Sequence, residues 1–120
     1  IKYLDDSIKI NPNDAFAYFN KGKSLYFLNK LTEAIECYNR AIEINLQYSD
    51  AYNNKGLALY YLNKLTEAIE CYNRAIEINP QDSDAYNGKG NALKALNKLT
   101  EAIECYNRAI EINPQDSDAY

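Results

Sequence analysis

The chain has 120 residues, which is enough for about one domain. Its 47% hydrophobic and 25% charged residues are typical of a globular protein, and no apolar run reaches the roughly 18 residues that a membrane span needs. The net charge of −4 argues against a binder of duplex nucleic acid, and the absence of histidine removes the commonest general base and metal ligand. Because the chain begins with Ile1 and carries no signal-like start, we expect it to be a piece of a longer protein.

The sequence repeats every 34 residues. The segment NKLTEAIECYNRAIEIN occurs unchanged at 29–45, 63–79 and 97–113, and NPQDSDAY occurs at 79–86 and 113–120. Such periodicity is typical of repeat proteins. It divides the chain into the end of a preceding repeat at 1–14, three full repeats at 15–48, 49–82 and 83–116, and the start of a further repeat at 117–120.

Each repeat carries two helical patterns. In the second repeat, apolar or small side chains recur every three or four positions in 51–62 and again in 65–78, which predicts two amphipathic helices. Only Asn63 and Lys64 lie between them, and so short a connection forces the two helices to be antiparallel. Units of this kind bury their faces against one another and stack into an open solenoid.

The junctions contain residues that end and begin helices. Asn tolerates the left-handed conformation, so we expect Asn29, Asn63 and Asn97 to end the first helices. Between repeats, Asn79-Pro80 stops one helix, and Asp82 or Ser83 can cap the next. On the second helix, Glu70 and Arg74 are spaced for an ion pair four residues apart.

Residues at fixed places in the repeat resemble the tetratricopeptide repeat family, whose signature combines an aromatic residue, glycine, alanine and a closing proline. The places are filled by Tyr18, Tyr52 and Tyr86; Gly22, Gly56 and Gly90; Ala34, Ala68 and Ala102; Tyr38, Tyr72 and Tyr106; Ala41, Ala75 and Ala109; and Pro80 and Pro114. The resemblance implies an all-α, right-handed solenoid of antiparallel helix pairs. It also implies a scaffold that binds peptides or proteins on a concave side lined by the first helices.

The chain departs from the family at several places. Leu46 replaces the closing proline, so we expect a less rigid first turn between repeats. Lysine stands before each glycine where the family has leucine, and Leu25 and its two equivalents replace a tyrosine. One subtype of the family clamps a chaperone tail through five polar residues. Their places hold Phe19, Lys23, Asn54, Asp84 and Gly88 here, and only Asn54 matches, so we do not expect chaperone-tail binding.

Within the helices, the three copies differ chiefly on one face of the first helix. The second helices are identical, whereas the first helices change from aromatic in the first repeat to polar in the third. The resemblance places this variable face in the groove. The predicted binding residues are Phe16, Phe19, Asn20, Lys23, Tyr26, Phe27, Asn53, Asn54, Leu57, Tyr60, Tyr61, Asn87, Asn91 and Lys94. Asp50, Asp84, Gly88 and Ala95 also vary but are not among them.

A packing role for the aromatic residues remains open. Phe16 and Phe19 can pack on the leading segment, against Tyr3 or Leu4. The aromatic pairs at 26–27 and 60–61 can pack on each other along the stack. The differences between the copies are also compatible with drift on a solvated face.

No residue pattern points to catalysis. Cys37, Cys71 and Cys105 recur at equivalent places in units about 10 Å apart, which is too far for a disulfide, and the spacing suits no zinc site. The serines of the chain have no histidine to activate them. We therefore expect no enzyme activity, cofactor or metal. The free thiols indicate a reducing, intracellular and cytoplasmic location.

The leading hypothesis is a non-catalytic scaffold for a protein or peptide partner. The alternative is self-association through terminal helices that lack a covering partner, which gives a homo-oligomer by stacking or swapping. RNA binding, known from other helical repeats, is disfavoured by the acidic charge. We expect no nucleic-acid or membrane partner.

Overall fold

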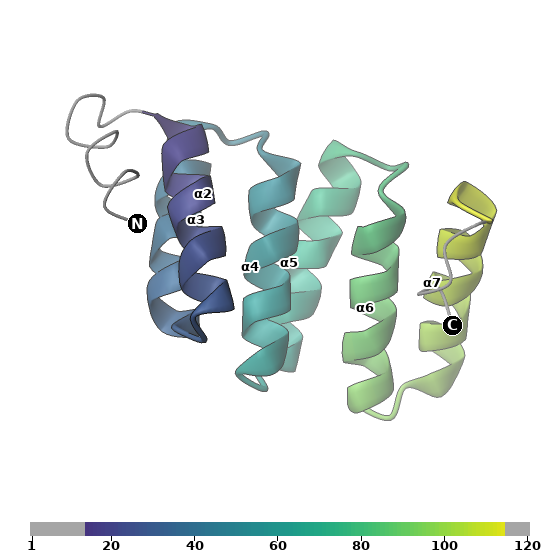
Figure 1. Cartoon of the computed structure of the whole chain (residues 1–120). Coiled ribbons are helices and arrows are strands. Elements are labelled where there is room, and N and C mark those ends of the chain that lie inside the picture. The colour runs from purple at the N-terminus through teal and green to yellow at the C-terminus, as the bar shows by residue number, and fades with distance from the viewer. Residues whose placement is uncertain (1–13, 115–120) are drawn as a thin grey trace.

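The computed structural model describes residues 14–114. This part of the chain contains six helices and no strand, arranged as a row of antiparallel pairs (Figure 1). The helices are α2 (Ala15–Phe27), α3 (Leu31–Ile44), α4 (Ser49–Tyr61), α5 (Leu65–Ile78), α6 (Ser83–Ala95) and α7 (Leu99–Ile112). The predicted all-α, right-handed solenoid of antiparallel helix pairs is confirmed, and most of the two predicted end fragments lies outside the described residues.

The turn inside each pair is set by an asparagine. Asn29, Asn63 and Asn97 have φ angles of 61°, 62° and 63°, as the sequence predicts. In the first turn, the Lys30 amide donates to the Leu25 carbonyl at 2.8 Å, and the Asn29 amide donates to that of Tyr26 at 2.9 Å. These two bonds satisfy carbonyls that the helix end leaves open and reverse the chain tightly. The same bonds recur in the other two repeats.

The helix starts differ in one repeat. The Asp14 and Asp82 side chains accept hydrogen bonds from the amides of Ala17 and Ala85, at 3.0 and 3.2 Å. Of the two predicted caps at 82 and 83, Asp82 is therefore the one used. Tyr48 occupies the equivalent place before α4 and caps nothing with its side chain.

The turns between repeats keep one geometry although one of them lacks proline. The Tyr48 amide donates to the Asn45 carbonyl, and the Asp82 amide donates to that of Asn79, both at 3.1 Å. The Asn45 and Asn79 side chains also accept from the amide two residues on, at 3.1 and 3.2 Å. The asparagine therefore holds the turn whether Leu46 or Pro80 follows it.

The core lies between the two helix layers. Tyr38 and Tyr72 are the largest fully buried side chains, and they are surrounded by alanines that are almost wholly inaccessible. Gly22 on α2 and Gly56 on α4 face these rings so closely that a Cβ atom would lie 2.6 and 3.0 Å from the nearest ring carbon. The small residues of the repeat therefore let each first helix approach the ring on its partner helix.

The row curves toward the layer of first helices. Each first helix packs chiefly on the second helix of its own repeat, and each second helix packs on the next first helix. The first helices also contact each other, α2 with α4 and α4 with α6, whereas the described second helices do not. Closer spacing on one side makes that side concave, so the inner layer consists of α2, α4 and α6.

The second helices carry a repeated arginine contact that corrects one prediction. Arg74 pairs with Glu77 at 3.1 Å, not with Glu70. Its guanidinium also lies over the ring of Tyr52, 5.7 Å from the ring centre, and the equivalent arginines contact Tyr18 and Tyr86 in the same way. Stacking on the tyrosine of the partner helix orients the arginine toward the carboxylate in the following turn.

Candidate functional site

Two adjoining cavities open along the concave layer, and we call them together the groove. The first has a volume of about 360 Å³ and lies between α2 and α4, with one wall from α6. The second has a volume of about 440 Å³ and lies between α4 and α6. They share Asn53, Asn54, Leu57 and Asp84, so the groove is continuous across all three described repeats.

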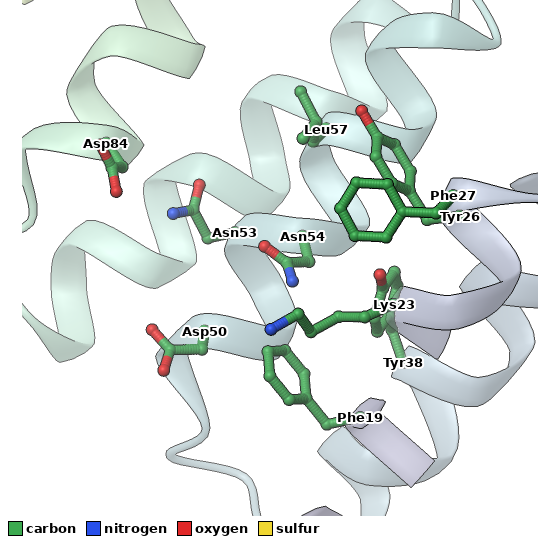
Figure 2. A pocket seen from close by; sticks show the side chains of 10 residues that line it. All are labelled: Phe19, Lys23, Tyr26, Phe27, Tyr38, Asp50, Asn53, Asn54, Leu57 and Asp84. Atoms are coloured by element: carbon green, nitrogen blue, oxygen red, sulfur yellow. The ribbon is translucent and has the colours of Figure 1, made fainter. Parts of the chain in front are cut away.

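One end of the groove is aromatic. Tyr26 and Phe27 line the first cavity from α2 (Figure 2). Their rings meet edge to face at 5.4 Å between centres, and Tyr26 also lies 6.3 Å from Tyr61. Tyr61 in turn meets Tyr60 at 5.3 Å. The four rings do pack along the stack, yet Phe27 stays 79% and Tyr61 60% exposed, so they present an apolar surface to solvent.

Phe19 forms the floor of the first cavity and is a core residue. It is only 8% exposed, and its ring lies 6.0 Å from that of Tyr38 and 5.1 Å from that of Tyr48. The ammonium of Lys23 sits above this ring, 5.4 Å from its centre (Figure 2). The described packing partners of Phe19 thus lie on α3 and in the turn before α4, whereas Tyr3 and Leu4 lie outside the described residues.

Two buried tyrosines reach the groove from the outer layer. Burial raises the pKa of Tyr38 to about 12, while the nearby Asn54 side chain acts in the opposite direction. Burial also raises the pKa of Tyr72, which lines the second cavity beside Gly88. A Cβ atom on Gly88 would lie 2.4 Å from the Tyr72 ring, so glycine at this place lets the ring contact α6 directly.

The other end of the groove is polar. Asp50 and Asn53 stand three residues apart on α4, and Asp84 and Asn87 repeat this pattern on α6. Asn87 is 7% exposed, and its Oδ1 atom has no hydrogen-bond partner within residues 14–114. Further along α6, Asn91 accepts a bond of 2.6 Å from the Tyr106 hydroxyl. The polar end therefore offers amide donors and acceptors, among them the unpaired Oδ1 of Asn87, together with a negative charge.

The predicted binding residues fall into three groups. Nine line the groove: Phe19, Lys23, Tyr26, Phe27, Asn53, Asn54, Leu57, Asn87 and Asn91. Tyr61 lines a neighbouring cavity of about 480 Å³ with Tyr26, Phe27, Asn29 and Leu31. Phe16, Asn20, Tyr60 and Lys94 line none of these cavities.

Sequence reasoning missed five residues that line the groove: Tyr38, Asp50, Tyr72, Asp84 and Gly88. The two aspartates share a helical stripe with Asn53 and Asn87, and this spacing could have identified them. The two tyrosines belong to the invariant second helices, where comparison between the copies gives no signal.

The cysteines offer little reactivity. None of the three forms a disulfide within residues 14–114, and Cys71 and Cys105 are buried. Burial raises the pKa of Cys71 to about 11 and also raises that of Cys105. Within residues 14–114 there is no cluster of three potential metal ligands, and no helix there is long and apolar enough to cross a membrane.

The fold and the groove define a helical-repeat protein of the solenoid class. Models of tetratricopeptide repeats match residues 49–82, 83–116 and 3–36, and a further TPR repeat model matches residues 22–62. The chain therefore belongs to the tetratricopeptide repeat family. A search of curated protein sequences found no match.

Several solved structures are similar to the chain. The first TPR of Spaghetti (RPAP3), bound to the HSP90 peptide SRMEEVD, is 30% identical, with a TM-score of 0.85 over 88% of this chain and 83% of that one. The first TPR domain of human RPAP3 is 30% identical, with a TM-score of 0.87 over 91% and 86%. MamA is 26% identical, with a TM-score of 0.90 over 98% and 68%.

Proposed function

We propose that this chain is a non-catalytic interaction module that binds a peptide segment of a partner protein in the groove. The observation that carries the proposal is the match between variation and geometry. The three second helices are identical, while most of the residues that line the groove belong to the variable face of the first helices. The exposed ring of Phe27, which lines the same cavity as buried Phe19, is suited to anchor an apolar side chain.

The related structure with an HSP90 peptide supports a peptide partner, but the groove chemistry argues for a different peptide. That peptide, SRMEEVD, is rich in carboxylates. Among the described residues that line it, the groove carries two carboxylates, Asp50 and Asp84, and one cation, Lys23. Like charges repel at short range, so an acidic tail is disfavoured here. We further propose repeat boundaries at 15–48, 49–82 and 83–116, and an intracellular location, which suits three cysteines that form no disulfide among the described residues.

A matched pair of variants tests the groove. Phe27 and Phe16 both lie on α2 and are 79% and 64% exposed, but only Phe27 lines the groove. Peptides selected from a random seven-residue display library on the wild-type protein are measured by fluorescence anisotropy against Phe27→Ala and Phe16→Ala. We expect Phe27→Ala to weaken binding by about tenfold and Phe16→Ala to leave it unchanged, because anchor residues carry most of the energy. Equal affinities for the two variants would refute the groove.

The outward face of α7, which no described helix covers, favours self-association as a second candidate. Ile35 and Ile69 are half-buried against neighbouring repeats, whereas Ile103 at the equivalent place on α7 is 57% exposed and Leu99 is 53% exposed. An apolar helix face of this kind can pack against a second copy. Sedimentation over a range of concentrations tests the idea, with Ile103→Lys as the variant expected to abolish assembly. A strictly monomeric wild-type protein at high concentration would eliminate it.

A further inference from the structure

We propose that the polar end of the groove takes a cationic side chain, lysine or arginine, of the bound peptide, which donates to the Asp84 carboxylate and to Oδ1 of Asn87. This inference rests on the proposed peptide-binding function and specifies the chemistry of the partner. Figure 2 shows Asp50, Asn53 and Asp84 on the side of the first cavity away from Tyr26 and Phe27. A peptide lying along the groove therefore meets an apolar surface first and an acidic one second.

The charge of the residues that line the second cavity favours a positively charged ligand group. Its lining residues include one carboxylate, that of Asp84, and no lysine or arginine. Asp84 is exposed and makes no ion pair with the described residues. Asp50 lines only the first cavity, which Lys23 also lines, whereas Asp84 lines both cavities and so extends to the one whose described lining has no cation. Asp84 is therefore the carboxylate available to a cation from the ligand.

An unsatisfied acceptor beside that carboxylate provides independent support. Asn87 lines the same cavity from the same helix, one turn beyond Asp84. Its Oδ1 atom is buried and accepts from no donor in the described part of the chain. A buried acceptor left unpaired costs free energy that a hydrogen bond recovers, so the free protein is arranged to accept a donor from outside. The equivalent places in the other repeats hold Phe19 and Asn53, and neither has such an atom.

A cationic side chain satisfies both groups at once. Lysine carries three donors and arginine five, with a positive charge and no acceptor that would face Asp84 or Asn87. A peptide amide can donate to Asn87 but leaves the Asp84 charge uncompensated. A carboxylate is repelled by Asp84 and brings no donor to Asn87. Among peptide groups, only a cation matches the charge and the hydrogen-bonding of this cavity.

The experiment uses peptides selected from a random seven-residue display library on the full chain. The most enriched peptide and its analogue, with each basic residue replaced by norleucine, are measured on wild type, Asp84→Asn and Asn87→Ala. The control is Glu70→Gln, which also removes one negative charge but lines neither cavity. We expect selected peptides to carry lysine or arginine at a fixed position, and Asp84→Asn to weaken them about fivefold to tenfold while leaving the analogue unaffected.

Asn87→Ala separates a binding role from a structural one. We expect it to weaken the cationic peptide at least threefold while leaving the melting temperature unchanged or raised, because it removes an unpaired acceptor from a helix. If Asp84→Asn or Asn87→Ala weakens binding of the peptide and of its analogue equally, a backbone amide of the peptide contacts these residues. The proposed cationic side chain is then refuted. Selected peptides that need Phe27 but show no basic preference overturn this inference and leave the proposed function standing. If no peptide is selected, both are overturned.

Discussion

Replacing Gly22 with alanine places a methyl group against a ring that has no room to move. The new Cβ would lie 2.6 Å from Cε1 and 2.8 Å from Cδ1 of Tyr38, and 3.2 Å from the backbone oxygen of Ala34. Tyr38 is 1% exposed and lies against Phe19, so its ring cannot turn toward solvent. The methyl group therefore pushes α2 away from α3 or forces the ring out of its rotamer.

The expected magnitude follows from two opposing terms. Overpacking a sealed site costs about 1–3 kcal/mol. Alanine in place of glycine inside a helix gains about 1 kcal/mol. At Gly22 the first term exceeds the second, and we expect a net loss of about 1 kcal/mol in the free energy of unfolding.

The third repeat contains the matched control. At Gly90 the new Cβ would lie 2.7 Å from Cε1 of Tyr106, a similar clash. Tyr106, however, is only half-buried, because no described helix covers α7 on that side. Its ring can shift outward at little cost in free energy. The gain in helix propensity therefore decides the sign of the change in the free energy of unfolding. We expect Gly90→Ala to be neutral or to stabilise the protein by up to about 1 kcal/mol.

Urea unfolding followed by circular dichroism at equal protein concentration measures both variants against wild type. Thermal unfolding gives a second readout, in which 1 kcal/mol corresponds to about 4–8 °C for a domain of this size. If Gly90→Ala destabilises as much as Gly22→Ala, burial of the opposing ring does not control the cost. If Gly22→Ala is stabilising, the close approach of α2 to Tyr38 is not tight. Either result refutes the reasoning.

Three further predictions address the turns, the buried phenols and the thiols. Asn63→Ala should lower the free energy of unfolding by about 1 kcal/mol, because alanine resists the positive φ, while Asn63→Gly should stay within a few tenths, as measured by urea unfolding. Burial raises the pKa of Tyr38 from 10.0 to about 12, above its unfolded value; its contribution to stability should be present below pH 10 and decline as pH rises toward 12. Unfolding at pH 9 and 11, with Tyr38→Phe showing a flatter profile, checks this. Because burial raises the pKa of Cys71 to about 11, a Cys37→Ser, Cys105→Ser variant should react with a disulfide reagent at pH 8 only after urea is added.

The features that recur in every repeat were predictable from the sequence. The identical second helices, the two-residue connections and the asparagines at 29, 63 and 97 set the helices and their turns locally. The structure has the helix pairs and positive φ angles at the expected places. Local sequence was enough to predict these features because the same short segment forms the same helix and turn in each of the three repeats.

Features that occur once were harder to predict. Phe19 is one of the variable residues and resembles an exposed anchor, but Tyr48 from the next turn covers it. The other two repeats have asparagine (Asn53 or Asn87) at the place of Phe19 and aspartate at the place of Tyr48. Phe19 and Tyr48 therefore differ from the other repeats together. Tyr48 thus replaces a cap worth about 1 kcal/mol with an aromatic contact across the repeat boundary. The linkage becomes visible only once the two residues are side by side.

The burial of individual groove residues was also not predictable from the sequence pattern. Asn53 and Asn87 hold equivalent places, yet only Asn87 is fully buried. Its surroundings depend on how closely α6 approaches α4 and Tyr72, and Gly88 permits that approach. For Arg74, two glutamates lie within reach along the helix, and stacking on Tyr52 decides between them. Contacts between helices thus decide between interactions that the sequence pattern alone does not distinguish.

The identical outer helices make the inner ones interchangeable. Because α3, α5 and α7 share every residue and the turns between repeats keep the same bonds with or without proline, each inner helix meets the same docking face. A 34-residue cassette could therefore be duplicated, deleted or shuffled without redesigning its neighbours. Recombination among such copies would change the order of aromatic and acidic residues along the groove, while the packing of the outer helices would stay the same.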